Sequence, residues 1–315
     1  MKKYIGTGLS VCIVLALVVL SVVSGNKGLT DMQSGTLKIL VIVCGCSIAY
    51  CFVVGEITRN YSQMDKLWSL LPIAYAWIIA GKGGMKARLV IAALIVTLWG
   101  ARLTMNFARK GAYKLKFWDG EEDYRWAIVR QNPLLKPRLA WALFDLFFIS
   151  FYQNALVLAI CLPLLGAMDA SAPLGWLDVL AAVGALGFLL LETVADEQQW
   201  KFHQKKKRLL KERKELKKLP KPYSLGFNTF GLWNRMRHPN YLGEQGFWVC
   251  IYIFAIAAGV ASKGVFHWTM GGCLLLVLLF VGSSALGESI SSGKYPKYTD
   301  YAARVFKYLP FRKYR

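Results

Sequence analysis

The sequence has few residues of the kinds that build metal centres and disulfide scaffolds. It contains three histidines and seven cysteines, and the cysteines lie inside apolar stretches without a Cys-x-x-Cys pair. An odd number of cysteines placed in this way excludes a disulfide framework. Dispersed histidines also disfavour a zinc or haem centre, so the sequence predicts no metal ligands.

Acidic residues are scarce too. Only 18 Asp and Glu accompany 39 Lys and Arg, which leaves a net charge of +21. Such a balance suits a polyanionic partner such as nucleic acid. However, the most basic run, Lys201 to Lys221, has almost no interleaved aromatic residues that could stack on bases. We therefore expect anionic lipid or a phosphate-bearing cofactor as the partner, and no nucleic acid.

Apolar residues, by contrast, make up 56% of the chain, and the mean hydropathy is +0.38. This is too apolar for a soluble globular protein. A transmembrane helix needs about 20 apolar residues, and eight runs of roughly this kind are present. They are Tyr4 to Ser24, Ile39 to Gly55, Leu67 to Gly81, Leu89 to Ala108, Ala140 to Met168, Leu174 to Ala195, Gln245 to Ser262 and Val265 to Gly287. The sequence predicts an all-α, polytopic membrane bundle of seven or eight transmembrane helices.

The loops between these runs alternate in basic charge. One set of loops carries 32 Lys and Arg, and the other carries five. The positive-inside rule then places both termini and the three long basic segments in the cytosol. The first run lacks a clear cleavage site, so we expect it to be retained. The predicted division is residues 1–60 as N-terminal transmembrane helices and 61–315 as a catalytic membrane domain with a basic cytosolic segment at 196–239.

Ionisable residues within the predicted spans are expected to have a structural or functional role, because placing a charged side chain in the membrane is unfavourable. Glu192, Asp196, Gln199 and His203 are spaced so that they share one stripe of a helix that emerges on the basic side. This stripe is either the wall of a polar cleft or a set of ion-pair partners that tie spans together. Asp178, near the opposite interface, is expected to face lipid headgroups.

The densest polar motif is Gly231 to Glu244. Pro239 disfavours a helical conformation at His238, and Asn240 is a residue type that can cap the N-terminus of a helix. Because an apolar run follows, the motif predicts a loop that ends at a helix N-terminus. Such a terminus favours an anion, and Arg235 and Arg237 add donors. The alternative to an anion site is a capped helix that simply begins at the membrane interface. The basic run after His203 is likewise either a helix extension on anionic lipid or, in its first half, a phosphate site.

These motifs resemble the integral-membrane reductases of the steroid 5-alpha-reductase C-terminal-domain superfamily, in particular a bacterial branch. Sterol C14 reductases and, more distantly, isoprenylcysteine carboxyl methyltransferases are related. The matching pieces are Asp65 to Pro72, Leu98 to Thr104, Glu122 to Trp126 with Arg130, Glu192 with Ala195 to Gln198 and Phe202, Gly231 to Glu244, and Tyr295 to Pro310. They cover most of the chain from Asp65 onward.

The resemblance implies NADPH-dependent reduction of an activated carbon-carbon double bond in a steroid-like or other lipid. No G-x-G-x-x-G motif follows a predicted strand, so NADPH must bind without a Rossmann domain, in a cleft that faces the cytosol. The implied cofactor-binding residues are Glu192, Asp196, Gln198, Phe202, Arg237, His238, Asn240 and Tyr241. The candidate catalytic residues are Asp65, Tyr241 and Glu244, and the candidate substrate-binding residues are Trp68, Trp99 and Arg102.

Each of these expectations has an alternative. Asp65 directly precedes an apolar run, so it could cap a helix rather than donate a hydrogen bond to the substrate. The His-Pro-Asn-Tyr element, here His238 to Tyr241, corresponds to one that binds S-adenosylmethionine in the related methyltransferases, so a membrane methyltransferase is the second hypothesis. A non-catalytic lipid-binding membrane protein is the third. The oligomeric state and the identity of the lipid stay open.

Overall fold

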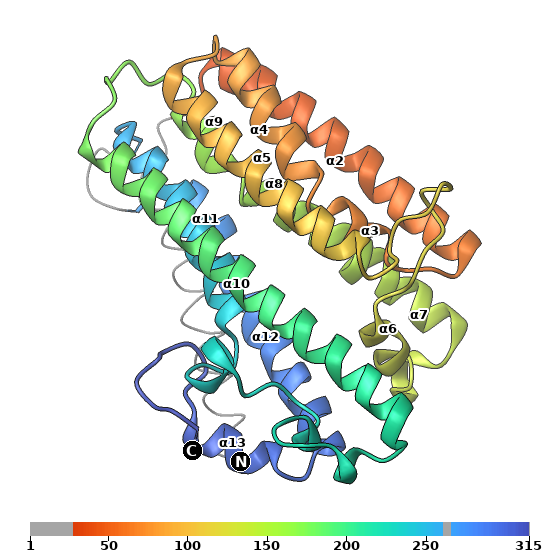
Figure 1. The fold of residues 1–315 in the computed structure, drawn as a ribbon. Helices are drawn as coiled ribbons and strands as arrows, with labels where there is room; N and C mark the ends of the chain where they lie inside the picture. The colour runs from red at the N-terminus through yellow and green to blue at the C-terminus, as the bar shows by residue number, and fades with distance from the viewer. Residues whose placement is uncertain (1–27, 261–265, 315) are drawn as a thin grey trace. The chain divides into compact units, whose positions relative to one another are not determined.

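The structure is a computed structural model, and it describes residues 28–260 and 266–314. All regular secondary structure in these residues is helical (Figure 1). The main helices are α2 (Asp31–Thr58), α3 (Gln63–Leu67), α4 (Leu71–Lys82), α5 (Ala87–Ala108), α6 (Tyr124–Val129), α7 (Arg138–Phe144), the π-helix η2 (Asp145–Tyr152), α8 (Gln153–Ala159), α9 (Leu162–Ala167), α10 (Trp176–Arg213), α11 (Pro239–Ala257), α12 (Gly271–Lys294) and α13 (Tyr298–Arg304). For this part of the chain, the prediction of an all-α fold is confirmed.

Five stretches of the described chain are helical, long enough and apolar enough to cross a membrane. They are Asp31–Thr58, Ala87–Ala108, Arg138–Ala167, Trp176–Arg213 and Trp268–Lys294. These stretches are compatible with a multi-pass membrane protein. They do not confirm the predicted count of seven or eight spans.

The remaining predicted spans have different outcomes. The run predicted at Leu67 to Gly81 forms α4, which has only 12 residues. The run predicted at Gln245 to Ser262 lies in α11 as far as Ala257, and its last two residues are outside the described residues. The 19 residues of α11 include polar ones in its first turns, such as Asn240 and Glu244. The run predicted at Tyr4 to Ser24 lies outside the described residues.

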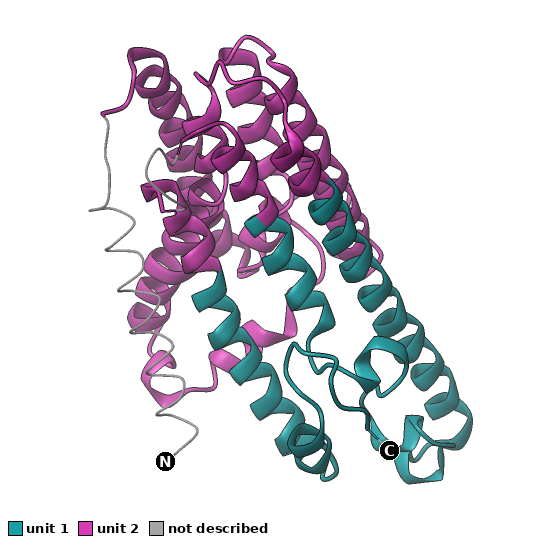
Figure 2. Cartoon of the chain, turned by 90° about the vertical axis from the view of Figure 1, so that its left-hand side faces the viewer, with its two compact units in different colours: residues 1–12, 183–249, 277–315 teal, residues 13–182, 250–276 magenta. Residues whose placement is uncertain are grey.

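The chain divides into two compact units, and each of them is discontinuous in sequence (Figure 2). Unit 2 holds the described residues up to 182 and 250–276, and unit 1 holds 183–249 and 277–314. The functional division predicted between 1–60 and 61–315 follows a different criterion and stays a prediction.

Unit 2 is built on close helix packing. Its buried side chains include Leu40, Tyr75 and Trp99, all fully inaccessible to solvent. A Cβ atom at Gly100 of α5 would lie 2.5 Å from the backbone oxygen of Ser69, so only glycine allows this approach. Beside it, the hydroxyls of Ser69 and Thr104 are hydrogen-bonded at 2.7 Å.

Unit 1 is organised around the second part of α10, the long green helix of Figure 1. α10 has 38 residues, which corresponds to a length of about 57 Å at about 1.5 Å per residue. The hydrocarbon core of a membrane is only about 30 Å thick, so a helix of this length exceeds what a single span needs, and its last turns are the polar ones. These are the turns that carry the basic residues after Lys201.

Candidate functional site

The predicted polar stripe lies on one continuous helix. Glu192, Asp196, Gln199 and His203 all belong to α10, in unit 1. The side chains of Gln199 and His203 are in contact, with 3.1 Å between their Nε2 atoms. Glu192 is buried, whereas Asp196 and Gln199 are partly exposed. The stripe therefore runs from a buried carboxyl group to the basic end of the helix.

The loop that precedes α11 and the first turn of α11 are attached to this helix at three points. The backbone N-H of Leu232 donates to Oε1 of Gln198 at 2.9 Å, and Nε1 of Trp233 donates to the carbonyl of Ala195 at 3.0 Å. Gly231 has a φ of +54°, and a Cβ atom there would lie 2.5 Å from the Gln198 amide. The loop thus needs glycine both for its backbone conformation and for its approach to α10.

The third attachment joins the two predicted parts of the cofactor site. Nδ2 of Asn240 donates to Oδ1 of Asp196 at 3.2 Å. Helix α11 begins at Pro239, so Asn240 lies inside its first turn, and the expectation that Asn240 caps the helix is wrong. Proline is well suited to this first position, because the first N-H groups of a helix lack an intrahelical partner and none is lost.

Arg237 and His238 share an acidic partner that the sequence did not single out as a site residue. Oε1 of Glu288 accepts from Nε of Arg237 at 2.8 Å and lies 2.9 Å from Nε2 of His238. All three side chains are largely buried. Burial lowers the pKa of His238 below its ordinary 6.5, although the hydrogen bond with Glu288 opposes this shift. In the sequence, Glu288 stands out only because it is an acid that directly follows the predicted span Val265 to Gly287.

Arg237 also binds the C-terminal segment. Its NH1 donates to the carbonyls of Ala302 and Val305 at 2.7 and 2.5 Å. The hydroxyl of Tyr301 donates to the carbonyl of Trp233 at 2.5 Å. The donors of Arg237 are thus directed at protein groups, and a phosphate could bind there only by replacing some of these contacts.

The two other candidates on α11 lie close to this cluster. The ring of Tyr241 stacks on His238, with ring centroids 5.0 Å apart and an angle of 15°, and it also contacts Phe280 at 4.6 Å. Glu244 is buried, and its Oε1 accepts from Nε1 of Trp248 at 3.1 Å. Both residues are therefore held in place by neighbouring aromatic side chains.

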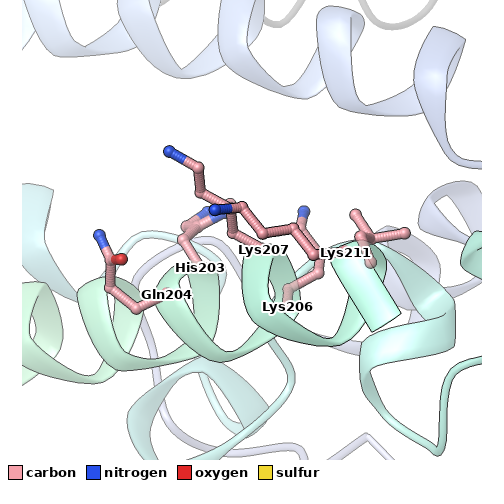
Figure 3. A pocket seen from close by; sticks show the side chains of 6 residues that line it. His203, Gln204, Lys206, Lys207 and Lys211 are labelled. Atoms are coloured by element: carbon pink, nitrogen blue, oxygen red, sulfur yellow. The ribbon is translucent and has the colours of Figure 1, made fainter. Parts of the chain in front are cut away.

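Phe202 marks the transition to the basic end of α10. It is buried and stacks on Tyr223, with centroids 5.2 Å apart. Beyond it, an open hollow of about 480 Å³ is lined by side chains of α10 alone (Figure 3). The lining residues are His203, Gln204, Lys206, Lys207, Leu210 and Lys211. Nζ of Lys206 is bound to the carbonyl of Gly226 at 2.6 Å, so Lys207 and Lys211 are the lysines left for a ligand.

Asp65 lies in unit 2, in a separate polar network. Its Oδ2 accepts from Nε1 of Trp126 at 2.9 Å, and its Oδ1 is 3.9 Å from NH2 of Arg125. Burial raises the pKa of Asp65 above its ordinary 3.8, although the Arg125 charge opposes this shift. Ser62, not Asp65, precedes helix α3, so the alternative that Asp65 caps a helix is wrong.

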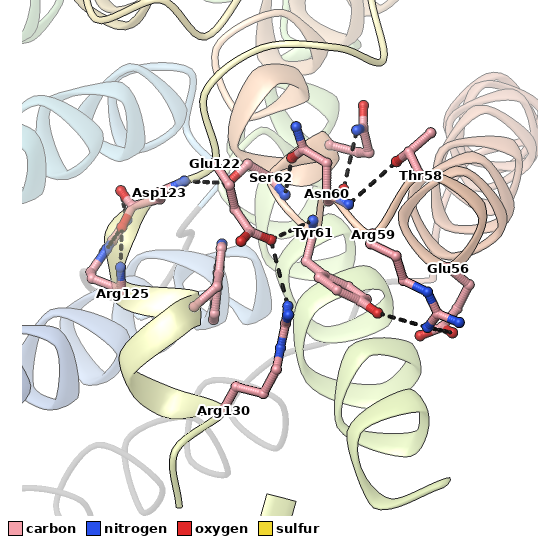
Figure 4. A network of polar contacts seen from close by, with 12 residues as sticks. Glu56, Thr58, Arg59, Asn60, Tyr61, Ser62, Glu122, Asp123, Arg125 and Arg130 are labelled. Atoms are coloured by element: carbon pink, nitrogen blue, oxygen red, sulfur yellow. Dashed lines mark hydrogen bonds and ion pairs between the residues drawn. The ribbon is translucent and has the colours of Figure 1, made fainter. Parts of the chain in front are cut away.

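Around Asp65, the turn after α2 binds the segment that leads into α6 (Figure 4). The backbone N-H of Tyr61 donates to Glu122 at 2.9 Å, and the N-H of Asp123 donates to the hydroxyl of Ser62 at 2.9 Å. Lys66 is fully buried and donates to the carbonyls of residues 117 and 119 at 2.7 Å. Burial lowers its pKa to about 8. The network holds Asp65 in a fixed, largely dehydrated position.

The predicted substrate residues also belong to unit 2. Trp99 is fully buried in α5, and Arg102 lies three residues further along the same helix. Trp68 directly follows α3 and is half-buried. Asp65, Trp68, Trp99 and Arg102 are thus gathered in one unit, and the predicted cofactor residues are gathered in the other. Within the described ranges, no group of three or more His, Cys, Asp or Glu is placed to hold a metal ion.

Comparisons with known proteins extend over most of the chain. Residues 51–305 match the family model described as "Protein of unknown function (DUF1295)". An uncharacterized protein of Schizosaccharomyces pombe is 35% identical over 280 residues, which are 82% of this chain and 77% of the relative. No solved structure matches the chain. The two matches say nothing of steroid 5-alpha-reductases, so that resemblance stays a prediction.

Proposed function

We propose that this chain, which belongs to the family described as "Protein of unknown function (DUF1295)", is an integral-membrane NADPH-dependent reductase. The proposed reaction reduces an activated carbon-carbon double bond in a steroid-like or other lipid. The family description fixes no chemistry. The proposal therefore depends on the residues in unit 1 and on the resemblance to the steroid 5-alpha-reductase superfamily.

The observation that carries the proposal is the hydrogen bond between Asn240 and Asp196. It joins two segments that lie 44 residues apart in the sequence, and the resemblance assigns both of them to the cofactor. Gln198 and Trp233 also join α10 to the loop that leads into Asn240. A cofactor site made of distant segments requires that they meet, and here they do.

Two acceptor oxygens near this contact could receive hydrogen bonds from the donor groups of a dinucleotide. Oδ1 of Asn240 and Oε1 of Gln199 are buried, and neither has a hydrogen-bond partner in the described part of the chain. Buried acceptors of this kind are unfavourable unless a donor reaches them. The ribose hydroxyls and the carboxamide of NADPH carry such donors. The residues present thus fit the proposed cofactor.

The basic hollow on α10 fits its phosphates. Lys207 and Lys211 lie one helical turn apart and reach over the hollow that begins at His203 (Figure 3). Lysine is a common phosphate ligand that acts as a point charge. S-adenosylmethionine carries no phosphate and has a cationic sulfonium, so a basic hollow favours NADPH over the methyl donor.

In this proposal, bound NADPH supplies a hydride to the substrate. The residues of the chain must then stabilise the negative charge that develops on the substrate oxygen. Asp65 is the first proposed donor, because burial raises the pKa of its carboxyl group and so favours the protonated form, which can donate a hydrogen bond. The hydroxyl of Tyr241 is the rival donor, and Glu244 beside it is a further buried acid.

We also propose that the site faces the cytosol, because the basic loops predict this orientation. A cysteine introduced at the exposed Lys218 should then resist a membrane-impermeant maleimide in intact cells, and one at the exposed Ser171 should react. The reverse labelling pattern overturns the orientation.

A ligand-stabilisation experiment tests the proposed function. NADPH should raise the melting temperature of the purified protein, because a ligand that binds only the folded state stabilises it by about 2.7 kcal/mol at 100 times its Kd. NADH, which lacks the 2'-phosphate, should stabilise less. Replacing both Lys207 and Lys211 by Gln should reduce the NADPH effect, whereas the same change at the exposed Lys217 and Lys218 is the matched control.

Two results overturn the proposal. Stabilisation by S-adenosylmethionine and not by NADPH indicates the methyltransferase. Stabilisation by neither compound indicates a lipid-binding protein without this chemistry.

A further inference from the structure

Unit 2 contains two aspartates that are almost equally buried in candidate membrane spans. Asp145 is 1% exposed and Asp178 is 5% exposed. Asp178 has a full set of partners: Nε of Arg88 donates to its Oδ1 at 2.6 Å, and NH2 of Arg88 donates to its Oδ2 at 2.9 Å. The N-H of Gly175 adds a third bond at 2.9 Å. Asp178 is thus a compensated carboxylate, and the expectation that it faces lipid headgroups is wrong.

Asp145 has almost none of this compensation. Its Oδ1 accepts one hydrogen bond, from the hydroxyl of Ser150 at 3.2 Å. Its Oδ2 is buried and lacks a hydrogen-bond partner among the residues that the structure describes. In the same part of the chain, no basic side chain lies within 4.0 Å of either oxygen. A buried negative charge without a partner is strongly unfavourable, so the two aspartates cannot be in the same state.

The helix geometry places further polar atoms on the same face. The π-helix η2 puts Ser150 one wide turn after Asp145, and the start of α8 puts Asn154 one α-turn after Ser150. Nδ2 of Asn154 donates to the carbonyl of Ser150 at 2.7 Å, and Oδ1 of Asn154 is buried without a partner within the described ranges. π-Helical segments are rare and are found frequently at functional sites. Here the π-turn aligns an acid, a hydroxyl and an amide.

Helix α2 covers this face closely. A Cβ atom at Gly55 would lie 3.4 Å from Oδ2 of Asp145, and the Cys51 sulfur is 3.7 Å from Nδ2 of Asn154. Cys51 and Gly55 are one helical turn apart, so α2 presents a small residue to the acid and a thiol to the amide. This cover excludes bulk water from the carboxyl group.

The charged groups nearest to Asp145 do not replace the missing partner. Glu56 on α2 is an acid, so it offers no positive charge, and its Oε2 is paired with Arg59 at 3.1 Å. The guanidinium of Arg130 lies over the rings of Tyr61 and Trp141 at 4.7 and 4.4 Å and is 3.7 Å from Glu122 (Figure 4), and within the described residues it makes no hydrogen bond or ion pair with Asp145. Protonation of the Asp145 carboxyl group removes its negative charge, so no basic partner is then required.

We propose that Asp145 is an intramembrane proton-binding site, in which Oδ2 carries the proton, Ser150 donates to Oδ1 and Asn154 continues the polar face. Asp178 stays ionised. The proposal uses only unit 2 and is independent of the reductase chemistry proposed above.

A hydrophobic carbodiimide distinguishes the two aspartates chemically. Such a reagent enters the membrane phase and reacts with a protonated carboxyl group. The acid proton moves to one nitrogen of the carbodiimide, and a carboxyl oxygen bonds to its central carbon. The acyl group of this adduct then shifts to nitrogen and leaves a stable N-acylurea. No atom leaves, and no oxidant or reductant is needed.

The experiment treats the full chain in detergent with dicyclohexylcarbodiimide and locates the adduct by peptide mass spectrometry. We expect an adduct at Asp145 and none at Asp178, with a yield that falls as the pH is raised. Asp145→Asn should abolish the adduct. Absence of the adduct at Asp145 at every pH overturns the proposal. Protection by sodium chloride but not by choline chloride also overturns it, because the site would then hold a metal cation and not a proton.

A second measurement compares the same substitution, Asp to Asn, at the two positions. Asn is the neutral analogue of a protonated Asp, so Asp145→Asn should shift the melting temperature by less than about 3 °C. Asp178→Asn removes a charge that Arg88 needs, so it should lower the melting temperature by about 6 °C or more. An equal loss in both variants, or failure of Asp145→Asn alone to fold, overturns the proposal.

Discussion

The carboxylate of Glu288 and the imidazole of His238 are joined at 2.9 Å, and this contact connects α12 to the residue that precedes α11. The same oxygen of Glu288 accepts from Arg237. One acidic side chain therefore holds two of the residues that the resemblance assigns to the cofactor. Its importance for unit 1 can be measured directly.

Glu288→Ala should lower the free energy of unfolding by about 3 to 5 kcal/mol, because it leaves the largely buried Arg237 guanidinium without its carboxylate partner. Glu288→Gln keeps an acceptor and should lose less. Unfolding in detergent measures both. The control is Glu215→Ala, since Glu215 is 60% exposed in its pair with Lys218 and a surface change stays within about 0.5 kcal/mol. Equal losses at positions 288 and 215 would contradict the buried pair.

His238 should make stability depend on pH. Its pKa in the folded protein lies below the ordinary 6.5, because burial disfavours the charged ring. As the pH falls below about 6.5, the unfolded chain takes up a proton more readily than the folded one, so stability should decrease in that range. His238→Gln should remove this part of the decrease. Melting curves between pH 8 and 5, values chosen to bracket about 6.5, measure the difference. An unchanged slope in the variant contradicts the assignment.

The sequence predicted the local helical structure better than it predicted which distant side chains form hydrogen bonds and ion pairs. Hydrophobic runs and helix spacing placed Glu192, Asp196 and His203 on one helix, because such patterns depend on near neighbours in the chain. The partner of Asp178 is 90 residues away, and that of His238 is 50 residues away. Such pairs depend on how helices pack, and composition and spacing contain no record of that packing. For the same reason, the sequence shows Glu288 as an acid that directly follows a predicted span, but it does not show that Glu288 is the partner of His238.

Gly243 should be irreplaceable at the contact between α10 and α11. A Cβ atom there would lie 2.7 Å from Cβ of Glu192 and 2.9 Å from the backbone oxygen of Phe188, and neither atom can move without the helix. Gly243→Ala should therefore destabilise the protein by about 1 to 3 kcal/mol. Gly187→Ala is the matched control on α10, because nothing lies within 4 Å of its added Cβ. A neutral effect at both positions would contradict the close packing.

Asp65 and Tyr241 are rival donors to the substrate oxygen, and two conservative changes separate them. If Asp65 is the donor, Asp65→Asn should slow hydride transfer by on the order of 100-fold while NADPH binding survives. Tyr241→Phe should then have a smaller effect, and the order reverses if Tyr241 is the donor. Single-turnover NADPH oxidation, read together with the melting temperature, measures this. A destabilised Asp65→Asn protein with an intact rate removes Asp65 from the chemistry.

Hydride transfer itself is the most direct test of the proposed function. The purified protein is incubated with a lipid extract and with NADPH deuterated at the transferred position of the nicotinamide ring, and the lipids are analysed by mass spectrometry. The account predicts a lipid that gains one deuterium and one proton across a former double bond, and it predicts loss of this product in the Asp196→Ala variant. A wild-type protein that binds NADPH but transfers no deuterium to any lipid, or that transfers a methyl group from S-adenosylmethionine instead, would contradict it.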